Sequence, residues 1–521
     1  MGSARKNGVV NLSQVHGEKC WPMVDKISPC EEACPIHMDI PSYVIALSQG
    51  KIKEAIDIVR QTNPFPSICG RVCHHPCEEA CTRSMVDRPI AIEWLKRYIG
   101  QIEQGNGNKR PRIRHRRKER VAIIGSGPAG LTAAHDLVIK GYGVSVFEAL
   151  PVAGGMLAAG IPDFNLPKNI VKFEVDYIRA MGVEIKTNMR IGKDFSLEDI
   201  RDQGYRAVLL ATGAWKSAEL KIPGIDLKGV IQALKFLREV KLGEKHHIKG
   251  QVVVIGGGNV AVDAARTALR LGAEKVTLAC LESRADMPAF VWEIEKAEKE
   301  GVDILSSLAP QKVISKTGGK VKQVAFTRVA RLSRDKDGKL SWDLASGEEN
   351  EVIKEAATVI VAIGQVPDPS FAQGVDLNKA GTFEINPETM ATNIKGVFAA
   401  GDAAKFPGTI VEAIAAGHRA ARSINQYLRG KVPKITPKKK IREVFKLGEE
   451  TVIPSFLVKK DRWDMPSLSN GDAKRSFGET SLGYTELQVI EEAKRCLNCR
   501  MCGNCIFDRG QLCFETSTRL L

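Results

Sequence analysis

The key segment of the sequence is Val121-Ala-Ile-Ile-Gly125-Ser-Gly127-Pro-Ala-Gly130-Leu131, in which an apolar run passes into helical spacing through Gly-x-Gly-x-x-Gly. Glycines at these positions allow a tight turn, close approach of a pyrophosphate and close helix packing, while free amides at the helix start bind phosphate. The next apolar run ends in Glu148, where a carboxylate can accept hydrogen bonds from an adenosine ribose. Together these features predict a dinucleotide site rather than a structural glycine turn.

A second segment of the same construction is Val252-Val-Val-Ile-Gly256-Gly-Gly258-Asn-Val-Ala261. The strand expected after it, at 275–282, ends in Glu282, and an acid there suits the free ribose hydroxyl of NAD and repels the 2′-phosphate of NADP. Arg284 lies close by and could contact phosphate. The segment therefore favours NADH, with NADPH as the alternative.

Apolar runs alternate with helical spacing from residue 121 onward, in the order VAIIG, VSVFE, AVLLATG, VVVIGGG, KVTLACLE and TVIVAIG. This alternation is typical of parallel sheets with crossover helices. The two glycine-rich turns lie about 130 residues apart, so they imply two such sheets. A chain of 521 residues also exceeds what one core usually holds, which indicates several domains.

Composition and charge exclude some classes of protein. No apolar run reaches the roughly 18 residues of a membrane span, and the amino terminus, MGSARKNGVVNLSQ, lacks the apolar core of a secretory signal. We therefore expect a cytoplasmic protein. The net charge of +15 could suggest nucleic acid, but part of it lies in residues 109–120, KRPRIRHRRKER, where no aromatic residues interleave to stack bases. A solvated linker is the preferred interpretation, and no nucleic-acid partner is expected.

The 13 cysteines are unevenly distributed, with seven at positions 20–81, five at 496–513 and Cys280 alone between them. In a reducing compartment, clustered thiols are more often metal ligands than disulfides. Cys280 lies in an apolar strand and is interpreted as a small core residue. A redox disulfide beside the nucleotide sites is set aside, because that region has no second cysteine.

The first group of cysteines has the spacing of iron–sulfur ligands. Four of them recur at every fourth residue from Cys69 to Cys81, and Cys30-x3-Cys34-Pro resembles the end of a ferredoxin run. Soft, anionic thiolates at short spacing can converge on one cuboidal cluster, and a tetrahedral zinc site is the alternative. The candidate ligands are Cys20, Cys30, Cys34, Cys69, Cys73, Cys77 and Cys81.

The second group follows the pattern C-x2-C-x2-C-x2-C, with one further cysteine eight residues on. It resembles half of a ferredoxin, so four of its five thiols are expected to complete one 4Fe-4S cluster, with a zinc knot as the alternative. The candidate ligands are Cys496, Cys499, Cys502, Cys505 and Cys513.

The region around the first group is expected to be helical. Residues 40–61, IPSYVIALSQGKIKEAIDIVRQ, have helical apolar spacing with Pro41 at a start position and Gly50 as a break. This pattern predicts a helical hairpin within a small N-terminal domain.

Three short segments carry a resemblance to a known class: Ala211-Thr-Gly213, Ala362-Ile-Gly364 and Gly396-Val-Phe-Ala-Ala-Gly401-Asp402. They resemble the chain crossings and the late Gly-Asp motif of the two-dinucleotide-binding-domain flavoproteins. That resemblance implies an FAD domain that comes first and last, with an NAD domain inserted. It also implies that Asp402 binds the ribityl chain of the flavin.

Further segments narrow the resemblance, namely Gly154-Gly-Met-Leu157, Gly160-Ile-Pro162, Met287-Pro288 and Asn63-Pro-Phe-Pro followed by the cysteines at 69–81. In combination, over roughly residues 30–430, they resemble the small, beta subunit of glutamate synthase and related NAD(P)H-dependent FAD/iron–sulfur oxidoreductases. Relatives that use NADPH tend to carry arginines where this chain has Leu281-Glu282, which again favours NADH.

We therefore predict an α/β fold with two Rossmann-like dinucleotide-binding domains, for FAD and NAD, an N-terminal helical Fe-S domain and a small C-terminal ferredoxin-like Fe-S segment. The helical iron–sulfur domain is expected at 1–118. The FAD-binding domain is expected in two segments, 119–217 and 366–430, with the NAD-binding domain at 218–365 between them. Residues 431–521 are expected to form the linker and the C-terminal iron–sulfur segment.

The nucleotide-binding residues follow from the motifs and the resemblance. Those expected to bind FAD are Gly125, Gly127, Pro128, Ala129, Gly130, Glu148, Gly155, Met156, Leu157, Gly213, Gly401, Asp402, Thr409, Ile410 and Glu412. Those expected to bind NAD are Gly256, Gly258, Asn259, Val260, Glu282, Arg284 and Gly364. Glu412 begins a helix whose amino end is expected to stabilise negative charge at the flavin pyrimidine ring. No side chain is assigned as a catalytic acid or base, because hydride transfer requires none.

The resemblance implies two N-terminal four-iron clusters, with ligands shared between early and late cysteines. The pattern here lacks the family's additional cysteine between Cys20 and Cys30, and Lys96, a poor ligand, stands near where some relatives place Glu or Gln. Seven thiols cannot supply eight ligands. We expect one N-terminal cluster, a second only with a noncysteine ligand, and one C-terminal cluster.

The expected function is electron transfer between NADH, FAD and 4Fe-4S clusters, to or from a redox partner subunit that holds a cluster or the terminal catalytic site. Two alternatives remain. One is the beta subunit of glutamate synthase itself, using NADPH. The other is a wiring or assembly subunit whose nucleotide folds are only structural.

Overall fold

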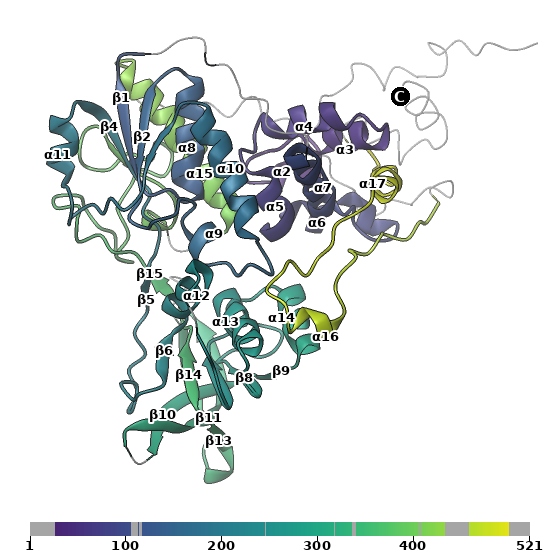
Figure 1. The fold of residues 1–521 in the computed structure, drawn as a ribbon, viewed down its shortest axis with the longest axis vertical. Coiled ribbons are helices and arrows are strands. Elements are labelled where there is room, and N and C mark those ends of the chain that lie inside the picture. The colour runs from purple at the N-terminus through teal and green to yellow at the C-terminus, as the bar shows by residue number, and fades with distance from the viewer. Residues whose placement is uncertain are drawn as a thin grey trace, which may run out of the picture.

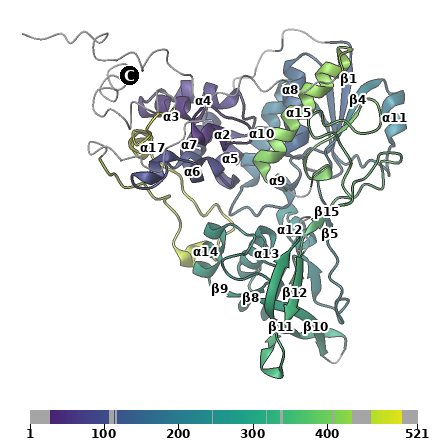
Figure 2. The same ribbon diagram turned by 180° about the vertical axis from the view of Figure 1, so that it is seen from behind.

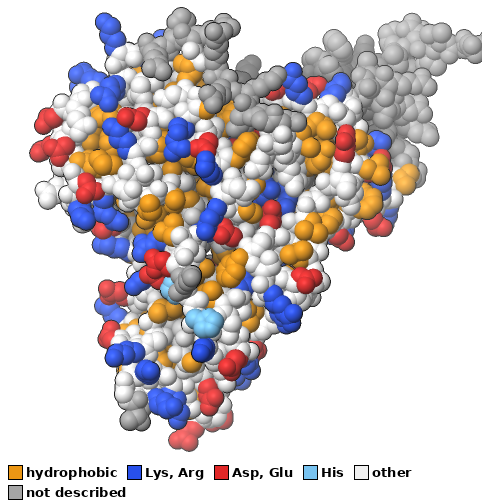
Figure 3. Space-filling view, viewed as in Figure 1, with side chains coloured by type: hydrophobic (Ala, Val, Ile, Leu, Met, Phe, Trp, Pro, Cys, Tyr) orange, Lys and Arg blue, Asp and Glu red, His pale blue; other side chains and the backbone are white. Residues whose placement is uncertain are grey.

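The structure is a computed structural model, which describes residues 27–105, 113, 117–244, 246–316, 318–335, 340–405, 408–432 and 458–499. Four of the predicted metal ligands lie outside the described residues, namely Cys20, Cys502, Cys505 and Cys513. Among the described helices, none has both the length and the apolar character to span a bilayer. On the face in Figure 3, Lys and Arg side chains are interspersed with Asp and Glu.

The N-terminal part is a bundle of short helices. Its elements are α2 (Pro29–Glu32), α3 (Ile40–Ser48), α4 (Ile52–Arg60), α5 (Pro66–Val72), α6 (Pro76–Glu79), η2 (Thr82–Met85) and α7 (Ile92–Gly105). The predicted hairpin is present as α3 and α4. Asp39 caps α3 by accepting a hydrogen bond from the Ser42 amide at 3.1 Å, and Gly50 turns the chain with a φ of +70°.

Helices α5 and α7 pack with their backbones in contact because each has a glycine at the crossing. A Cβ atom on Gly70 would lie 2.4 Å from the Cα of Arg97, and one on Gly100 would lie 2.6 Å from the Cα of Ser67. This close approach brings the side chain of Lys96, on α7, into the interior beside the cysteines of α5, and Lys96 is 2% exposed.

The first sheet holds the first glycine-rich turn. Its five strands are parallel in the order β16-β4-β1-β2-β3, with β1 (Arg120–Ile124), β2 (Gly143–Phe147), β3 (Glu184–Lys186), β4 (Tyr205–Leu210) and β16 (Val397–Ala399). The associated helices are α8 (Pro128–Ile139), α9 (Met156–Ala159), α10 (Lys168–Ala180), α11 (Leu197–Asp202), η4 (Gly401–Ala403) and α15 (Ile410–Leu428). Because β16 pairs with β4, the chain returns to this sheet after it has built another.

The inserted sheet holds the second turn. Its five parallel strands run β6-β14-β7-β8-β9, with β6 (Val230–Gln232), β7 (Gln251–Ile255), β8 (Lys275–Ala279), β9 (Val302–Leu305) and β14 (Thr358–Val361). Its helices are α12 (Ala233–Leu242), α13 (Asn259–Arg270) and α14 (Val291–Glu300). An antiparallel sheet is added by β10 (Leu308–Lys316), β11 (Lys320–Arg334), β12 (Leu340–Leu344) and β13 (Glu351–Glu355), with η3 (Glu348–Asn350) before β13.

Two chain crossings join the parallel sheets. Strands β5 (Lys216–Ser217) and β15 (Gln365–Val366) pair antiparallel shortly after Gly213 and directly after Gly364, the two glycines predicted to mark crossings. Figure 1 shows this pair between the upper sheet, with β1, β2 and β4, and the lower sheet, with β8 and β14. The predicted fold class, an α/β protein with two Rossmann-like domains and an N-terminal helical domain, is confirmed.

The C-terminal segment returns to the N-terminal helices. It contains α16 (Asn470–Ala473), which contacts α14, and α17 (Glu486–Ala493), which packs on α3 and α7. Figures 1 and 2 show α17 beside the N-terminal helices from both sides, although more than 380 residues separate α7 from α17 in the sequence.

Candidate functional site

The first glycine-rich turn is built so that backbone amides face a cavity. Gly125 has a φ of +103°, and a Cβ atom on it would lie 2.3 Å from the carbonyl oxygen of Ala211. A Cβ atom on Gly130 would lie 2.1 Å from the carbonyl oxygen of Gly125, so this glycine allows α8 to approach β1. Gly127 is the N-cap residue of α8, and a Cβ atom on it would meet no other atom within 4 Å, so there is open space beside this helix start. An anion such as a pyrophosphate fits at this helix start.

Glu148, at the end of β2, is held against the turn. Its carboxylate accepts hydrogen bonds from the amide of Ser126 at 3.0 Å, the hydroxyl of Ser126 at 2.6 Å and the amide of Leu150 at 2.8 Å. The Ser126 hydroxyl also accepts from the amide of Gly154 at 2.9 Å. The sequence did not single out Ser126, which joins the turn to the predicted segment at 154–157.

The start of α15 borders the part of the cavity that lies beside the first glycine-rich turn. Asp402 accepts a hydrogen bond from the amide of Gly408 at 3.1 Å, and burial raises its pKa. Thr409 and Glu412 form a capping box, in which the Glu412 carboxylate accepts from the Thr409 amide at 2.8 Å. That hydrogen bond lowers the pKa of Glu412. The carboxylate therefore completes the cap of its own helix.

The second turn repeats the geometry of the first. Gly256 has a φ of +139°, and a Cβ atom on it would lie 2.3 Å from the carbonyl oxygen of Ala362. Gly258 caps α13 and has open space before it. The middle position also requires a glycine, because a Cβ atom on Gly257 would lie 2.9 Å from a carboxylate oxygen of Glu282. Gly257 thus lets the acid lie directly against the phosphate-binding turn.

The ribose end of the second turn contains one arginine that the sequence reasoning missed. Arg334, on β11, lines the cavity and lies 3.7 Å from the carboxylate of Glu282, which is 7% exposed. Arg284 instead donates hydrogen bonds to Glu298 at 2.9 and 3.0 Å and does not line the cavity. Arg334 lies about 50 residues after Glu282, so only the pairing of the strands could reveal it.

A single cavity of about 1560 Å³ connects the two turns. The predicted flavin residues that line it are Gly125, Gly127, Pro128, Ala129, Glu148, Gly155, Met156, Leu157, Gly213, Gly401, Asp402, Thr409 and Ile410. The predicted coenzyme residues that line it are Gly256, Gly258, Asn259, Val260, Glu282 and Gly364. Gly130 and Glu412 lie behind this lining, where they position α8 and α15.

Four buried thiols of the N-terminal domain form one group around Lys96. Two of them lie on helices, Cys69 on α5 and Cys77 on α6, whereas Cys34 follows α2 and Cys73 follows α5. Burial raises the pKa of Cys69 to about 12, against the opposing effect of the Lys96 charge. Burial alone would lower the pKa of Lys96, but the four thiols raise it well above its ordinary value.

This donor set fits an iron–sulfur cluster. Four cysteine thiolates are the usual ligands of such a cluster, and the buried ammonium supplies a counter-charge in a site of low polarity. The first group is complete with four thiols, so Lys96 does not substitute for a missing ligand. Although Lys96 stands near where some relatives place a ligand, its role in this fold is that of a buried counter-charge.

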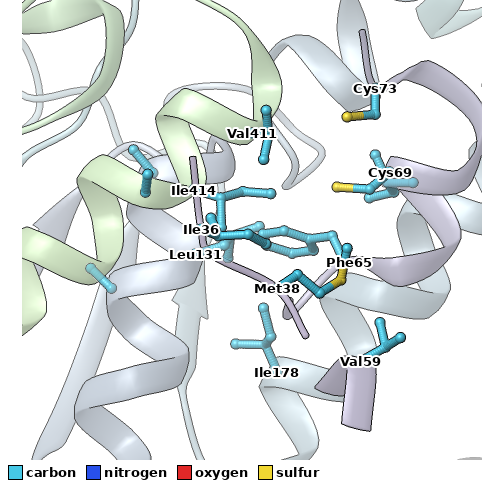
Figure 4. Close-up of a cluster of buried hydrophobic side chains, with 14 of the residues drawn as sticks. Ile36, Met38, Val59, Phe65, Cys69, Cys73, Leu131, Ile178, Val411 and Ile414 are labelled. Atoms are coloured by element: carbon cyan, nitrogen blue, oxygen red, sulfur yellow. The ribbon is translucent and has the colours of Figure 1, made fainter. Parts of the chain in front are cut away.

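The first group lies next to the helix that borders the flavin end of the cavity. In Figure 4, Cys69 and Cys73 lie on one side of a packed cluster that includes Phe65, and Val411 and Ile414 of α15 lie on the other. The first turn of the same helix, at Thr409 and Ile410, lines the cavity. Helix α15 thus connects the thiol group to the nucleotide cavity through continuous packing.

The other two N-terminal thiols that the structure describes, Cys30 and Cys81, do not join this group. They lie instead beside Cys496 and Cys499, which their spacing alone had placed in a separate tail site. Burial, with a smaller contribution from the neighbouring thiols, raises the pKa of Cys496 and of Cys499 to about 12. The spacing of the tail cysteines could not predict this, because the partners come from the opposite end of the chain.

Comparison with known proteins defines the class. Residues 119–417 match the family of pyridine nucleotide-disulphide oxidoreductases, and residues 13–108 match the family described as dihydropyrimidine dehydrogenase domain II, 4Fe-4S cluster. The first match covers more than half of the chain. This protein therefore belongs to the pyridine nucleotide-disulphide oxidoreductases, and it carries a 4Fe-4S domain at its N-terminal side.

Several named relatives are similar over most of the chain. The chain is 36% identical to the beta subunit of an NADPH-Fe(3+) oxidoreductase from Geobacter sulfurreducens, over 91% of this chain and 76% of the relative. It is 34% identical to the small chain of glutamate synthase [NADPH] from Azospirillum brasilense, over 77% of this chain and 86% of the relative. The expected resemblance to the glutamate synthase small subunit and its relatives is confirmed.

A third relative is the beta subunit of an NADP(+)-dependent formate dehydrogenase from Moorella thermoacetica, which is 40% identical over 82% of this chain. The chain spans 64% of that relative's length. Among solved structures, FprA of Mycobacterium tuberculosis in complex with NADPH matches with a TM-score of 0.52 and 20% identity, over 60% of this chain and 85% of FprA. That likeness concerns the fold.

Proposed function

We propose that this chain is the electron-transfer subunit of an NAD(P)H-dependent oxidoreductase. FAD binds at the turn of Gly125 to Gly130, the pyridine coenzyme binds at the turn of Gly256 to Glu282, and a 4Fe-4S cluster binds at Cys34, Cys69, Cys73 and Cys77. Bound FAD would exchange hydride with the nicotinamide and single electrons with the cluster. Electrons pass to or from a partner redox subunit.

One observation carries this proposal, namely the continuous path from nucleotide cavity to thiol group. Both glycine-rich turns open into the same cavity, so two dinucleotides can meet there. Helix α15 contributes Thr409 and Ile410 to the cavity and packs through Val411 and Ile414 toward Cys69 and Cys73. A structural or assembly subunit would need neither an open cavity nor this proximity.

The side chains of this chain bind and orient the cofactors rather than exchange protons. The amides at the starts of α8 and α13 bind the two pyrophosphates, and Glu148 and Glu282 bind the riboses. Asp402 binds the ribityl chain, and the start of α15 stabilises negative charge on the flavin. The apolar side chains packed between α15 and the thiols would exclude water from the path between a bound flavin and a bound cluster.

For the coenzyme we propose NADH. The support is Glu282, which is buried against the second glycine-rich turn and whose negative charge would repel a 2′-phosphate. NADPH is the second candidate. It is favoured by Arg334, 3.7 Å from Glu282, and by the NADP-dependent names of the relatives.

For the partner we propose a separate redox subunit, since two of the relatives named above are beta subunits of larger enzymes. The terminal substrate would then belong to that partner. A cytoplasmic location is also a proposal, supported by the free state of all nine described cysteines.

The test is an anaerobic titration of the purified protein with NADH and, separately, NADPH, following flavin bleaching and the iron–sulfur absorbance together. We expect NADH to bleach the flavin first and the clusters after it. If only NADPH bleached the flavin, the coenzyme would be NADPH and not NADH. No bleaching with either coenzyme, in protein that retains its flavin and iron, would exclude the electron-transfer function.

A further inference from the structure

The C-terminal segment is anchored on the N-terminal domain by buried charges. The side chain of Arg495 is fully buried, and it donates hydrogen bonds to Glu492 at 2.6 Å and to Asp87 at 2.7 Å. Glu492, also fully buried, accepts from the amide of Ala91 at 3.0 Å. An unpaired charge at these depths would be strongly destabilising, so this set of contacts fixes where the following residues lie.

The residues that follow are Cys496 and Cys499, and both lie against N-terminal groups. The sulfur of Cys499 lies 2.7 Å from the hydroxyl oxygen of Thr82, the neighbour of Cys81. The sulfur of Cys30 lies 3.3 Å from the hydroxyl of Ser28. Cys30, Cys81 and Cys496 all pack against the main apolar core. Cys30 lies within electrostatic range of Cys81 and Cys496, and Cys499 within range of Cys30 and Cys81, so four thiols from three distant parts of the sequence lie near one another.

The surroundings of this second group match those of the first. Arg83, which is 5% exposed, donates a hydrogen bond to the carbonyl of Arg495 at 3.2 Å. Arg495 precedes Cys496 directly and Arg83 lies two residues after Cys81, so two buried guanidinium groups lie close to the second group of thiols. Buried cations beside four thiols are expected where the thiols are anionic ligands.

We propose that Cys30, Cys81, Cys496 and Cys499 hold a second iron–sulfur cluster, so that the C-terminal segment completes a site of the N-terminal domain. This site depends neither on the identity of the coenzyme nor on the direction of electron flow. The C-terminal segment supplies two thiols, which together with the six described N-terminal cysteines make the eight ligands of two clusters. Of the five tail cysteines, Cys502, Cys505 and Cys513 then remain outside this site.

The spacing of the thiols is wider than a single zinc ion requires. Among the described residues, no three cysteine sulfurs lie within 4.8 Å of one another. Thiolates on one tetrahedral zinc ion, with zinc–sulfur distances near 2.3 Å, would lie only about 3.8 Å apart. A cuboidal core separates its four ligands more widely because they bind different iron atoms.

The test compares Cys→Ser variants of the full-length chain, purified anaerobically. Iron and zinc are measured for each, and low-temperature EPR spectra are recorded after reduction with dithionite, so neither flavin nor coenzyme is needed. We expect C30S, C81S, C496S and C499S each to lose about four iron atoms per chain and the same EPR signal. C69S should lose a different signal. C502S and C505S are the matched controls and should keep both.

Several outcomes would overturn the proposal. One is that C496S and C499S lose a signal that C30S and C81S retain, or that C502S loses the same one, which would return Cys496 and Cys499 to a tail cluster. Another is loss of zinc instead of iron. If a variant fails to fold, as judged by flavin content, alkylation of the unaltered protein decides the question. Reconstitution with iron and sulfide should protect Cys30, Cys81, Cys496 and Cys499 together, and independent protection would contradict the shared site.

Discussion

Glu282 and Arg334 present opposite charges at the ribose end of the second turn. The carboxylate is nearly buried and lies against Gly257, whereas the guanidinium reaches the cavity from β11 with a half-exposed side chain. A free ribose can satisfy the acid, and a 2′-phosphate can satisfy the arginine. If the second turn binds the coenzyme as proposed, we expect the balance between these two side chains, rather than either alone, to set the preference between NADH and NADPH.

Changing Glu282 to Gln should shift the preference toward NADPH. Loss of the carboxylate removes repulsion of a 2′-phosphate, so we expect the ratio of kcat/KM for NADPH over NADH to rise about tenfold, or about 1.4 kcal/mol. Arg334→Ala should move the ratio the other way. Arg284→Ala is the control and should leave it unchanged, because Arg284 pairs with Glu298 outside the cavity. A shift from Arg284→Ala alone would contradict this geometry.

Changing Lys96 to Met should lower the reduction potential of the first cluster. The buried ammonium offsets the negative charge that an added electron increases, so its loss disfavours reduction. We expect a decrease of about 60 mV or more, or about 1.4 kcal/mol for one electron, measured by EPR-monitored redox titration. Lys51→Met, at an exposed residue of the same domain, is the control. An unchanged potential would mean that Lys96 has only a packing role.

At the scale of elements, the crossing of α5 and α7 determines whether the first thiol group can form. Gly100→Ala should destabilise the N-terminal domain by about 1–3 kcal/mol, because its Cβ atom would overlap Ser67. Gly105→Ala, on the same helix but in open space, should be neutral or slightly stabilising. Thermal unfolding and iron content measure both. Equal stability of the two variants would show that the helices can separate without cost.

Helices α13 and α14 are joined by buried ion pairs with a defined pH dependence. Burial alone would raise the pKa of Glu300, but hydrogen bonds from Arg270 and Arg266 lower it to about 2. Because the folded pKa lies below the ordinary value of 4.5, this stabilisation is present above pH 4.5 and disappears as the pH falls toward 2.

Glu300→Gln should therefore weaken the loss of stability at low pH. We expect the free energy of unfolding in urea to be lower for the variant at neutral pH by on the order of 3 kcal/mol. Between about pH 5 and pH 3 this free energy should change less for the variant than for the unaltered protein. Glu298→Gln, in a half-exposed pair with Arg284, should behave like the unaltered protein. A parallel acid response of the Glu300 variant would contradict the assigned pair.

The elements around the two turns could be predicted from sequence because their signals are local. The glycines at 125–130 and 256–258, and the acids at 148 and 282, belong to single strand–turn–helix units with fixed spacing. Arg334 and the pairing of Cys30 with Cys496 depend on strand order and tail docking, which no local spacing encodes. The sequence places Lys96 near a ligand position of some relatives, but its role as a counter-charge depends on the α5–α7 crossing, which brings it among the thiols.

At the scale of the whole molecule, the position of the tail depends on Glu492. It accepts hydrogen bonds from the amides of Ala91 and Trp463 and from Arg495. Glu492→Ala leaves Arg495 and two amides without this partner, which costs about 3–5 kcal/mol locally. We expect limited proteolysis within residues 458–499 to become at least tenfold faster. Glu486→Ala, at the exposed start of α17, should not change the rate. Equal rates would show that other contacts retain the tail.

The meeting of the two ends of the chain has a consequence for the order of events during synthesis. The N-terminal domain emerges from the ribosome first, yet the anchoring residues Glu492 and Arg495 emerge only after both nucleotide-binding sheets. In the proposed site, Cys30 and Cys81 therefore remain reduced thiols without their partner ligands while some 400 further residues are translated. Assembly of the proposed second cluster becomes a late step, and a chain truncated before residue 496 would lack it while retaining every nucleotide-binding motif.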